Sequence, residues 1–278
     1  MANCMHCGRQ VLQTEQPDSF CPECRALTSE PAAQPAARHG RLALERMPVT
    51  TGIITVNALV FAAMILSGVS VSVPQIPQLI HWGANFGPRT LTSEPWRLLT
   101  SNYVHIGILH IALNMWCLWN LGALAERIFD RWTYFLTYTA CGISGSVTSL
   151  WWHRLGVGAG ASGAIFGLAG ALISALYFGR LPIPRRALQS TLKSLISFAG
   201  YNLFFGTVIP GIDNSAHLGG LLSGLILGTV LARHLASPAD ERNAWRRWVF
   251  VATGLVLALA FHFLRHLAQA TFPSPSFS

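Results

Sequence analysis

Long apolar segments are the feature that most constrains what this chain can fold into. Charged residues make up only 11% of the sequence, whereas soluble domains carry about a quarter. Only helices satisfy their backbone hydrogen bonds within a single lipid-embedded segment, so we expect an all-α membrane protein. Seven stretches are about long enough to cross a bilayer as helices, namely 50–72, 98–122, 132–152, 161–179, 192–209, 215–235 and 247–267.

The distribution of Lys and Arg predicts how these helices are oriented. If the N-terminus lies in the cytoplasm, the segments facing inside carry fifteen Lys and Arg residues and the segments facing outside carry four. Cytoplasmic loops are enriched in these residues, which favours seven spans with the C-terminus outside. This topology explains the net charge of +8, so we expect a lipid bilayer and no nucleic acid as partner. Compact loops and no targeting segment favour a prokaryotic inner membrane.

The first 25 residues contain four of the six cysteines. Cys4 and Cys7 form one C-x2-C pair, and Cys21 and Cys24 form a second, with thirteen residues between the pairs. Two thiolate pairs at such spacing suit a tetrahedral zinc site, and metal would supply the folding energy of so small a segment. Two disulfides are the alternative, which a reducing cytoplasm disfavours. We expect a structural zinc ion in a zinc-ribbon-like module.

The remaining organisation follows from composition. A Pro/Ala-rich stretch after the cysteines is expected to be a flexible linker, and the apolar segments then divide into a core and one further helix. The predicted domains are the zinc-ribbon-like module at 1–25, the linker at 26–48, the transmembrane core at 49–236, the C-terminal seventh helix at 237–270 and a tail at 271–278.

Polar side chains inside membrane spans are costly and are functional candidates by default. Spans two, four and six all run from outside to inside, so Ser162 and His217 are predicted to lie at similar depth near the outer face. His110 and Asn114 are four residues apart and share one helix face. The polar residues of these three spans that we single out as candidates are His105, His110, Asn114, Ser162, Asn214 and His217.

Glycines at four-residue spacing accompany these polar groups. Small residues at this spacing let transmembrane backbones pack closely, and a short serine side chain reaches a neighbouring helix only across such an interface. The sequence therefore predicts that spans four and six press Ser162 against His217. The glycines concerned are Gly163 and Gly167 in span four and Gly220, Gly224 and Gly228 in span six.

Serine beside histidine is the core of nucleophilic acyl transfer, in which the imidazole takes the hydroxyl proton and returns it to the leaving group. The N–H of Ser162 at a helix start, with His110 and Asn114, could stabilise the oxyanion. No Asp or Glu lies in these spans, so we predict a Ser–His dyad. Asp213 is expected to cap the sixth span.

Four short motifs resemble the rhomboid intramembrane serine proteases. They are G-A-S-G at 160–163, H-x4-H-x3-N at 105–114, A-H-x-G-G-x3-G from Ala216, and E-x-W-R at 94–97, in the right order between about residues 50 and 235. The resemblance implies a rhomboid-like bundle of six transmembrane helices, to which this chain adds a seventh.

Carried onto this sequence, the resemblance implies that Ser162 is the nucleophile and His217 the base. It matches His110 and Asn114 to the oxyanion-stabilising pair. His105, Trp96 and Arg97 match structural positions. Phe166 stands where the family often has a tyrosine that stacks on the catalytic histidine; the ring is kept and the hydroxyl is lost.

The function that this resemblance implies is intramembrane endopeptidase activity. Its substrates would be membrane proteins, cleaved in or near a transmembrane segment towards the outer face, with no cofactor for catalysis. Two alternatives stay open on the sequence. One is an inactive rhomboid-like protein that binds transmembrane clients. The other is a transporter or zinc-responsive protein in which His105 and His110 bind metal.

Overall fold

The computed structural model describes residues 2–3, 10–11, 47–179, 181 and 184–269. The chain divides into two units, Met1–Ala43 and Leu44–Ser278. In the first unit, β1 (Ala2–Asn3) pairs antiparallel with β2 (Gln10–Val11). The four predicted zinc ligands, the linker up to residue 46 and the tail at 271–278 lie outside the described residues.

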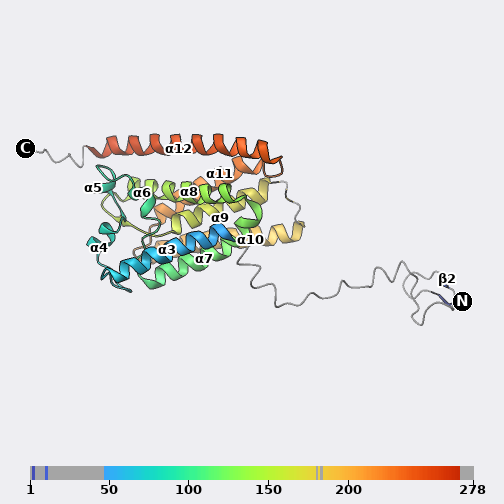
Figure 1. Cartoon of the computed structure of the whole chain (residues 1–278), viewed down its shortest axis with the longest axis horizontal. Helices are drawn as coiled ribbons and strands as arrows, with labels where there is room; N and C mark the ends of the chain where they lie inside the picture. The colour runs from blue at the N-terminus through green and yellow to red at the C-terminus, as the bar shows by residue number, and fades with distance from the viewer. Residues whose placement is uncertain (1, 4–9, 12–46, 180, 182–183, 270–278) are drawn as a thin grey trace, which may run out of the picture. The chain divides into compact units, whose positions relative to one another are not determined.

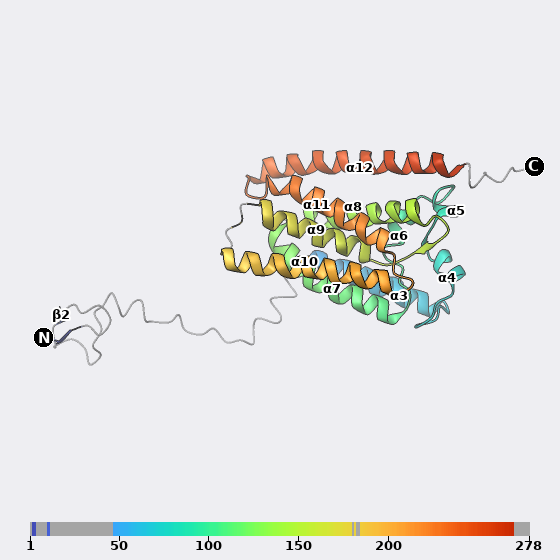
Figure 2. The same cartoon turned by 180° about the vertical axis from the view of Figure 1, so that it is seen from behind.

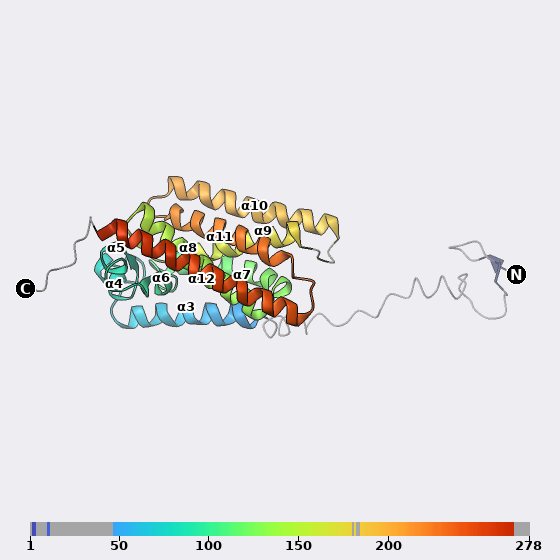
Figure 3. The ribbon, with the colours of Figure 1, turned by 90° about the horizontal axis from the view of Figure 1, so that it is seen from above.

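The second unit is a bundle of long helices. They run side by side, with α12 on one side of the bundle and α3 with α7 on the opposite side (Figures 1 and 2). Seen from above, α10 and α3 lie at opposite edges of the bundle (Figure 3). Over the described residues the long helices are α3 (Pro48–Leu66), α7 (Ile108–Ile128), α8 (Arg131–Trp152), α9 (Ser162–Phe178), α10 (Arg185–Val208), α11 (Asn214–Ala232) and α12 (Ala239–Gln269).

Short elements gather at one end of this bundle (Figure 1). The segment between α3 and α7 forms α4 (Ile76–His81), β3 (Asn85–Phe86), α5 (Gly87–Thr90) and α6 (Arg97–Thr100), and β3 pairs antiparallel with β4 (Val157–Gly158). Arg97 fixes this segment, since its buried guanidinium donates to the carbonyl oxygens of Ile80 and Ala84 and pairs with Glu94.

The predicted second span is wrong at its start. Residues 98–107 do not belong to the membrane helix, because α7 begins only at Ile108 and runs to Ile128. Gly107 has a φ of +85°, a conformation through which a right-handed helix cannot continue.

The residues before Gly107 form a local turn instead of a membrane helix. The Asn102 amide donates to the carbonyl oxygens of Leu98 and Leu99, which closes this turn. His110 therefore lies in the first turn of α7 and not in the middle of a span that begins at residue 98.

The other boundaries differ less. α3 ends at Leu66 and not at 72, and α10 begins at Arg185 and not at 192. α8, α9 and α11 lie within three residues of the predicted limits, whereas α12 extends beyond its predicted limits at both ends. Four described helices are long and apolar enough to span a membrane: α3, α7, α11 and α12. For α8, α9 and α10, spanning stays a prediction.

The core is centred on α9, where thirteen of 17 residues are buried. Its contact with α11 is made by glycines from both helices. A Cβ atom added to Gly220 would lie 2.0 Å from the carbonyl oxygen of Gly163, and one added to Gly224 would lie 1.9 Å from that of Gly167. No side chain fits at either position, so the predicted close packing of these two helices is confirmed.

Candidate active site

A glycine turn delivers Ser162 to the start of α9. Gly160 has a φ of +128°, which favours glycine, and its N–H donates to the carbonyl oxygen of Ser101 at 2.9 Å. A Cβ atom on Gly160 would lie 2.6 Å from Cε1 of His110. The turn therefore passes directly against the imidazole of α7, and Ser162 follows two residues later as the first residue of α9.

His217 lies in the first turn of α11 and is 8% exposed. Its ring stacks on Phe166, with centroids 4.3 Å apart and planes inclined by 13°. Phe166 is one turn beyond Ser162 on α9, so the stack brings the first turns of the two helices together. Among the described residues, no hydrogen bond joins the Ser162 hydroxyl to the imidazole, and Nδ1 of His217 has no hydrogen-bond partner.

His110 and Asn114 face this turn from α7. Nδ1 of His110 accepts the N–H of Ile106 at 3.2 Å, which leaves Nε2 as the donor of a neutral ring. That nitrogen would lie 2.9 Å from a Cβ atom on Gly160. Asn114 is buried, and its amide donates to the His110 carbonyl oxygen at 2.9 Å. One amide hydrogen of Asn114 is still available for a second acceptor.

His105 holds the segment before Ser162. Its side chain is fully buried, and the centroid of its ring lies 5.2 Å from the centroid of the His110 ring. Nε2 accepts the Ala161 N–H at 3.4 Å, and Nδ1 lies 3.3 Å from the Tyr103 carbonyl oxygen. Burial, together with the neighbouring His110, lowers the pKa of His105 to about 3. The ring is neutral at physiological pH and ties the loop to the start of α9.

The two loop residues predicted as structural lie away from this cluster. Trp96 is 49% exposed, whereas Arg97 is 1% exposed. The guanidinium carbon of Arg97 lies 4.6 Å from the centroid of the Trp96 ring. Both residues organise the segment between α3 and α7 and neither lines the cavity beside Ser162.

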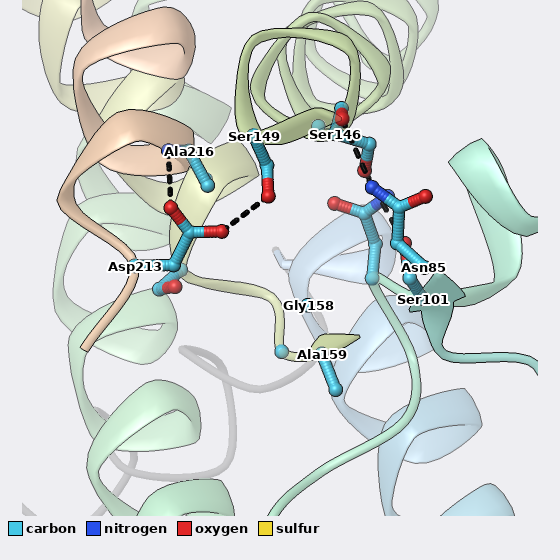
Figure 4. A pocket seen from close by; sticks show the side chains of 13 residues that line it. Asn85, Ser101, Ser146, Ser149, Gly158, Ala159, Asp213 and Ala216 are labelled. Carbon is cyan, nitrogen blue, oxygen red and sulfur yellow. Dashed lines mark hydrogen bonds between the residues drawn. The ribbon is translucent and has the colours of Figure 1, made fainter. Parts of the chain in front are cut away.

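A polar cavity of about 30 Å³ lies beside Ser162, which is room for one or two water molecules. Asp213 and Ser149 form one side, and Asn85, Ser101 and Ser146 form the other (Figure 4). The two hydroxyls of the second side lie 3.2 Å apart, and the Asn85 amide donates to the Ser146 carbonyl oxygen at 2.9 Å. The cavity could supply water to a reaction at Ser162.

The sequence reasoning did not identify the hydroxyl residues of this cavity. Ser146 and Ser149 lie in the last two turns of α8, at the end of the helix that the Lys and Arg distribution places outside. A run of hydroxyl residues at that end, S-G-S-V-T-S, was the available signal. It lies at the depth predicted for Ser162, so it could have been included in the candidate site.

Comparisons with known proteins agree with the motifs. The family model for the rhomboid domain matches residues 92–234, just over half of the chain. The chain is 36% identical over 186 residues to Rhomboid protease GluP of Bacillus subtilis (strain 168), covering 67% of this chain and 34% of that protein. It is 39% identical over 182 residues to RHOMBOID-like protein 1 of Arabidopsis thaliana, covering 60% and 46%.

A further relative is Rhomboid-like protease 1 of Toxoplasma gondii, which is 30% identical over 195 residues, covering 67% of this chain and 63% of that protein. The chain thus spans between 34% and 63% of the length of these three relatives. The region that the family model matches contains His105, His110, Asn114, Ser162, Phe166 and His217.

Proposed function

This chain belongs to the rhomboid family and is an integral membrane protein, and from that premise we propose that it is an intramembrane serine endopeptidase. Ser162 is the nucleophile and His217 the general base. The observation that carries the proposal is the stack of His217 on Phe166, one turn beyond Ser162, across helices in backbone contact. Such an interface lets a serine hydroxyl reach an imidazole on the neighbouring helix.

The reaction follows from the groups present. His217 takes the proton of the Ser162 hydroxyl as its oxygen attacks a peptide carbonyl carbon. The resulting oxyanion is stabilised by the Ser162 N–H, Nε2–H of His110 and the Asn114 amide. The protonated imidazole then gives its proton to the leaving amine. Water, activated by the same imidazole, hydrolyses the acyl-enzyme and restores the free hydroxyl.

The substrates we propose are membrane proteins cut in or near a transmembrane segment. A helix hides its carbonyl groups in its own hydrogen bonds, so the substrate has to unwind locally before Ser162 can attack. Gly or Pro near the outer face of the substrate helix would favour unwinding. We place the cleavage site towards the outer face of a prokaryotic inner membrane, as the distribution of Lys and Arg predicts.

Labelling with a fluorophosphonate probe tests the proposal. Wild-type protein in detergent micelles should react covalently, and the Ser162→Ala and His217→Ala variants should lose the label. Cleavage of a reconstituted transmembrane substrate should be lost in the same variants. Equal labelling of wild type and Ser162→Ala, under conditions where a control serine protease reacts, would contradict the proposal.

A second candidate function is a rhomboid-like protein that binds transmembrane clients without cleaving them. The observation in its favour is that the Ser162 hydroxyl makes no hydrogen bond to His217 within the described residues. Such a protein would bind clients and yet leave the probe unreacted. Metal transport has no such support, because the described residues contain no group of three or more metal ligands.

We also propose that Cys4, Cys7, Cys21 and Cys24 hold a structural zinc ion. The paired strands β1 and β2 flank the first cysteine pair in sequence, and two C-x2-C pairs are the ligand pattern of a structural zinc site. The purified full-length chain should contain roughly one zinc ion. The Cys21→Ser/Cys24→Ser double variant should lose the metal, and metal retained at the wild-type level in this variant would contradict the site.

A further inference from the structure

The carboxylate of Asp213 joins two helices at the outer end of the bundle. It caps α11, accepting the N–H of Ala216 at 3.0 Å and the hydroxyl of Ser215. It also accepts the hydroxyl of Ser149, which belongs to α8 and lies 64 residues earlier in the chain. Figure 4 shows one carboxylate oxygen directed at the Ala216 N–H of α11 and the other directed at the Ser149 hydroxyl. A helix cap needs only the bond to an N–H of α11. The additional bond to Ser149 therefore connects α11 to α8.

The same turn of α8 touches α11 through its backbone. A Cβ atom on Gly145 would lie 2.8 Å from the Ala216 carbonyl oxygen. Gly145 and Ser149 are four residues apart and share one face of α8. On the other side, a Cβ atom on Gly163 would lie 3.4 Å from the same oxygen. The first turn of α11 is therefore held between α8 and α9 immediately before His217.

No hydrogen bond from the described residues orients the His217 ring. Its Nδ1 is buried and unpaired, whereas in Ser-His-Asp triads a carboxylate bonds this nitrogen and fixes the ring. Here the nearest carboxylate in sequence bonds α8 instead. The ring orientation consequently depends on the stack with Phe166 and on where the first turn of α11 lies.

We infer that Asp213 is a positioning residue for His217, acting through its hydrogen bond to Ser149. The inference rests on the proposed function, in which His217 is the general base for Ser162. The bond locks the start of α11 against α8, and this fixes where the imidazole lies relative to Ser162. A displacement of about 1 Å costs on the order of 100-fold in rate.

Matched serine variants separate positioning from capping. Ser149→Ala removes the bond between helices and leaves the cap. Ser215→Ala removes a bond to the same carboxylate within α11. We expect Ser149→Ala to lower kcat and the fluorophosphonate labelling rate about tenfold or more, with KM unchanged. Ser215→Ala should stay within about twofold of wild type, and both variants should show similar Tm values. Ser149→Thr, which keeps the hydroxyl, should restore the rate.

Imidazole NMR gives a readout that does not require catalysis. With 13C-labelled histidine, and the His217 signal assigned from His217→Gln, Ser149→Ala should shift or broaden that signal while Ser215→Ala leaves it in place. Equal rates and equal spectra in the two alanine variants would overturn the inference and leave the proposed function intact. A wild-type protein that does not label would overturn the proposed function, and the NMR comparison would still decide whether Asp213 positions the ring.

Discussion

The central helix α9 meets its neighbours α11 and α10 in different ways. Against α11, an added Cβ atom on Gly224 would collide with backbone at 1.9 Å, whereas one on Gly200 of α10 would have nothing within 4 Å. Among the described side chains of α10, only Leu195 and Ala199 are buried. The bundle is thus tighter along the α9–α11 interface, which carries Ser162 and His217, than at the contact of α9 with α10, so positional precision is concentrated where the proposed chemistry needs it.

The largest effect should come from adding a single methyl group at the tight interface. Gly224→Ala should destabilise the fold by about 3 kcal/mol or more, because the obstructing atom is the backbone oxygen of Gly167 and cannot rotate away. The measurement is the free energy of unfolding in mixed micelles titrated with SDS. Gly200→Ala is the matched control and should lie within about 1 kcal/mol of wild type. Equal losses in the two variants would remove the distinction between the interfaces.

Phe166 allows the two interfaces to be compared at one side chain. Its ring stacks on the imidazole of His217 in α11. The centroid of the same ring lies 5.8 Å from the centroid of the Phe198 ring in α10. Phe166→Ala should cost about 3 kcal/mol of stability and slow fluorophosphonate labelling about tenfold, because His217 loses the one aromatic stack that it makes among the described residues. Phe166→Tyr keeps the ring and should label at nearly the wild-type rate.

Phe198→Ala is the corresponding change on the α10 side of the same ring. It should slow labelling about twofold at most, since it leaves the stack on His217 in place. If Phe198→Ala slowed labelling as much as Phe166→Ala, the position of His217 would depend on α10 as strongly as on the contact between α9 and α11.

Hydrogen exchange should reveal the same difference without any substitution. Elements with few buried contacts open locally at a lower free energy than the core. Backbone amides in the middle of α10 should therefore open about 2 kcal/mol more easily than those of α9, which corresponds to roughly thirtyfold faster exchange. The measurement is exchange by mass spectrometry on protein in nanodiscs. Equal protection of the two helices would contradict the comparison.

The sequence predicted the tight interface better than the helix ends. Glycines at four-residue spacing have one strong meaning inside apolar segments, which is close packing, and the structure has that contact. Hydropathy, in contrast, reports burial and not conformation. The segment 98–107 includes buried apolar residues such as Leu98 and Val104 although it is not part of a membrane helix, so its composition alone resembled the start of a span.

The candidate site was predictable in part for a similar reason. Ser162, His110 and His217 were costly polar groups at related depths, and a single sequence can show that. The bond between Ser149 and Asp213 joins residues 64 positions apart, and each of them has an ordinary local explanation as a hydroxyl near a helix end or as a helix cap. The bond that links Ser149 and Asp213 becomes visible only when α8 is seen to pack against α11.

The smallest effect concerns one hydrogen bond across the tight interface. Ser174 of α9 is buried, and its hydroxyl donates to the Leu225 carbonyl oxygen of α11 at 2.8 Å. Ser174→Ala should cost about 0.6–1 kcal/mol of unfolding free energy, as hydrogen bonds between membrane helices do. The matched control is Ser194→Ala on α10, whose hydroxyl bonds within its own helix to the Ser190 carbonyl oxygen at 3.1 Å. That change should stay within about 0.5 kcal/mol of wild type. A Ser194→Ala cost equal to that of Ser174→Ala would mean that polar contacts contribute alike at both interfaces, and glycine packing alone would then account for the difference between them.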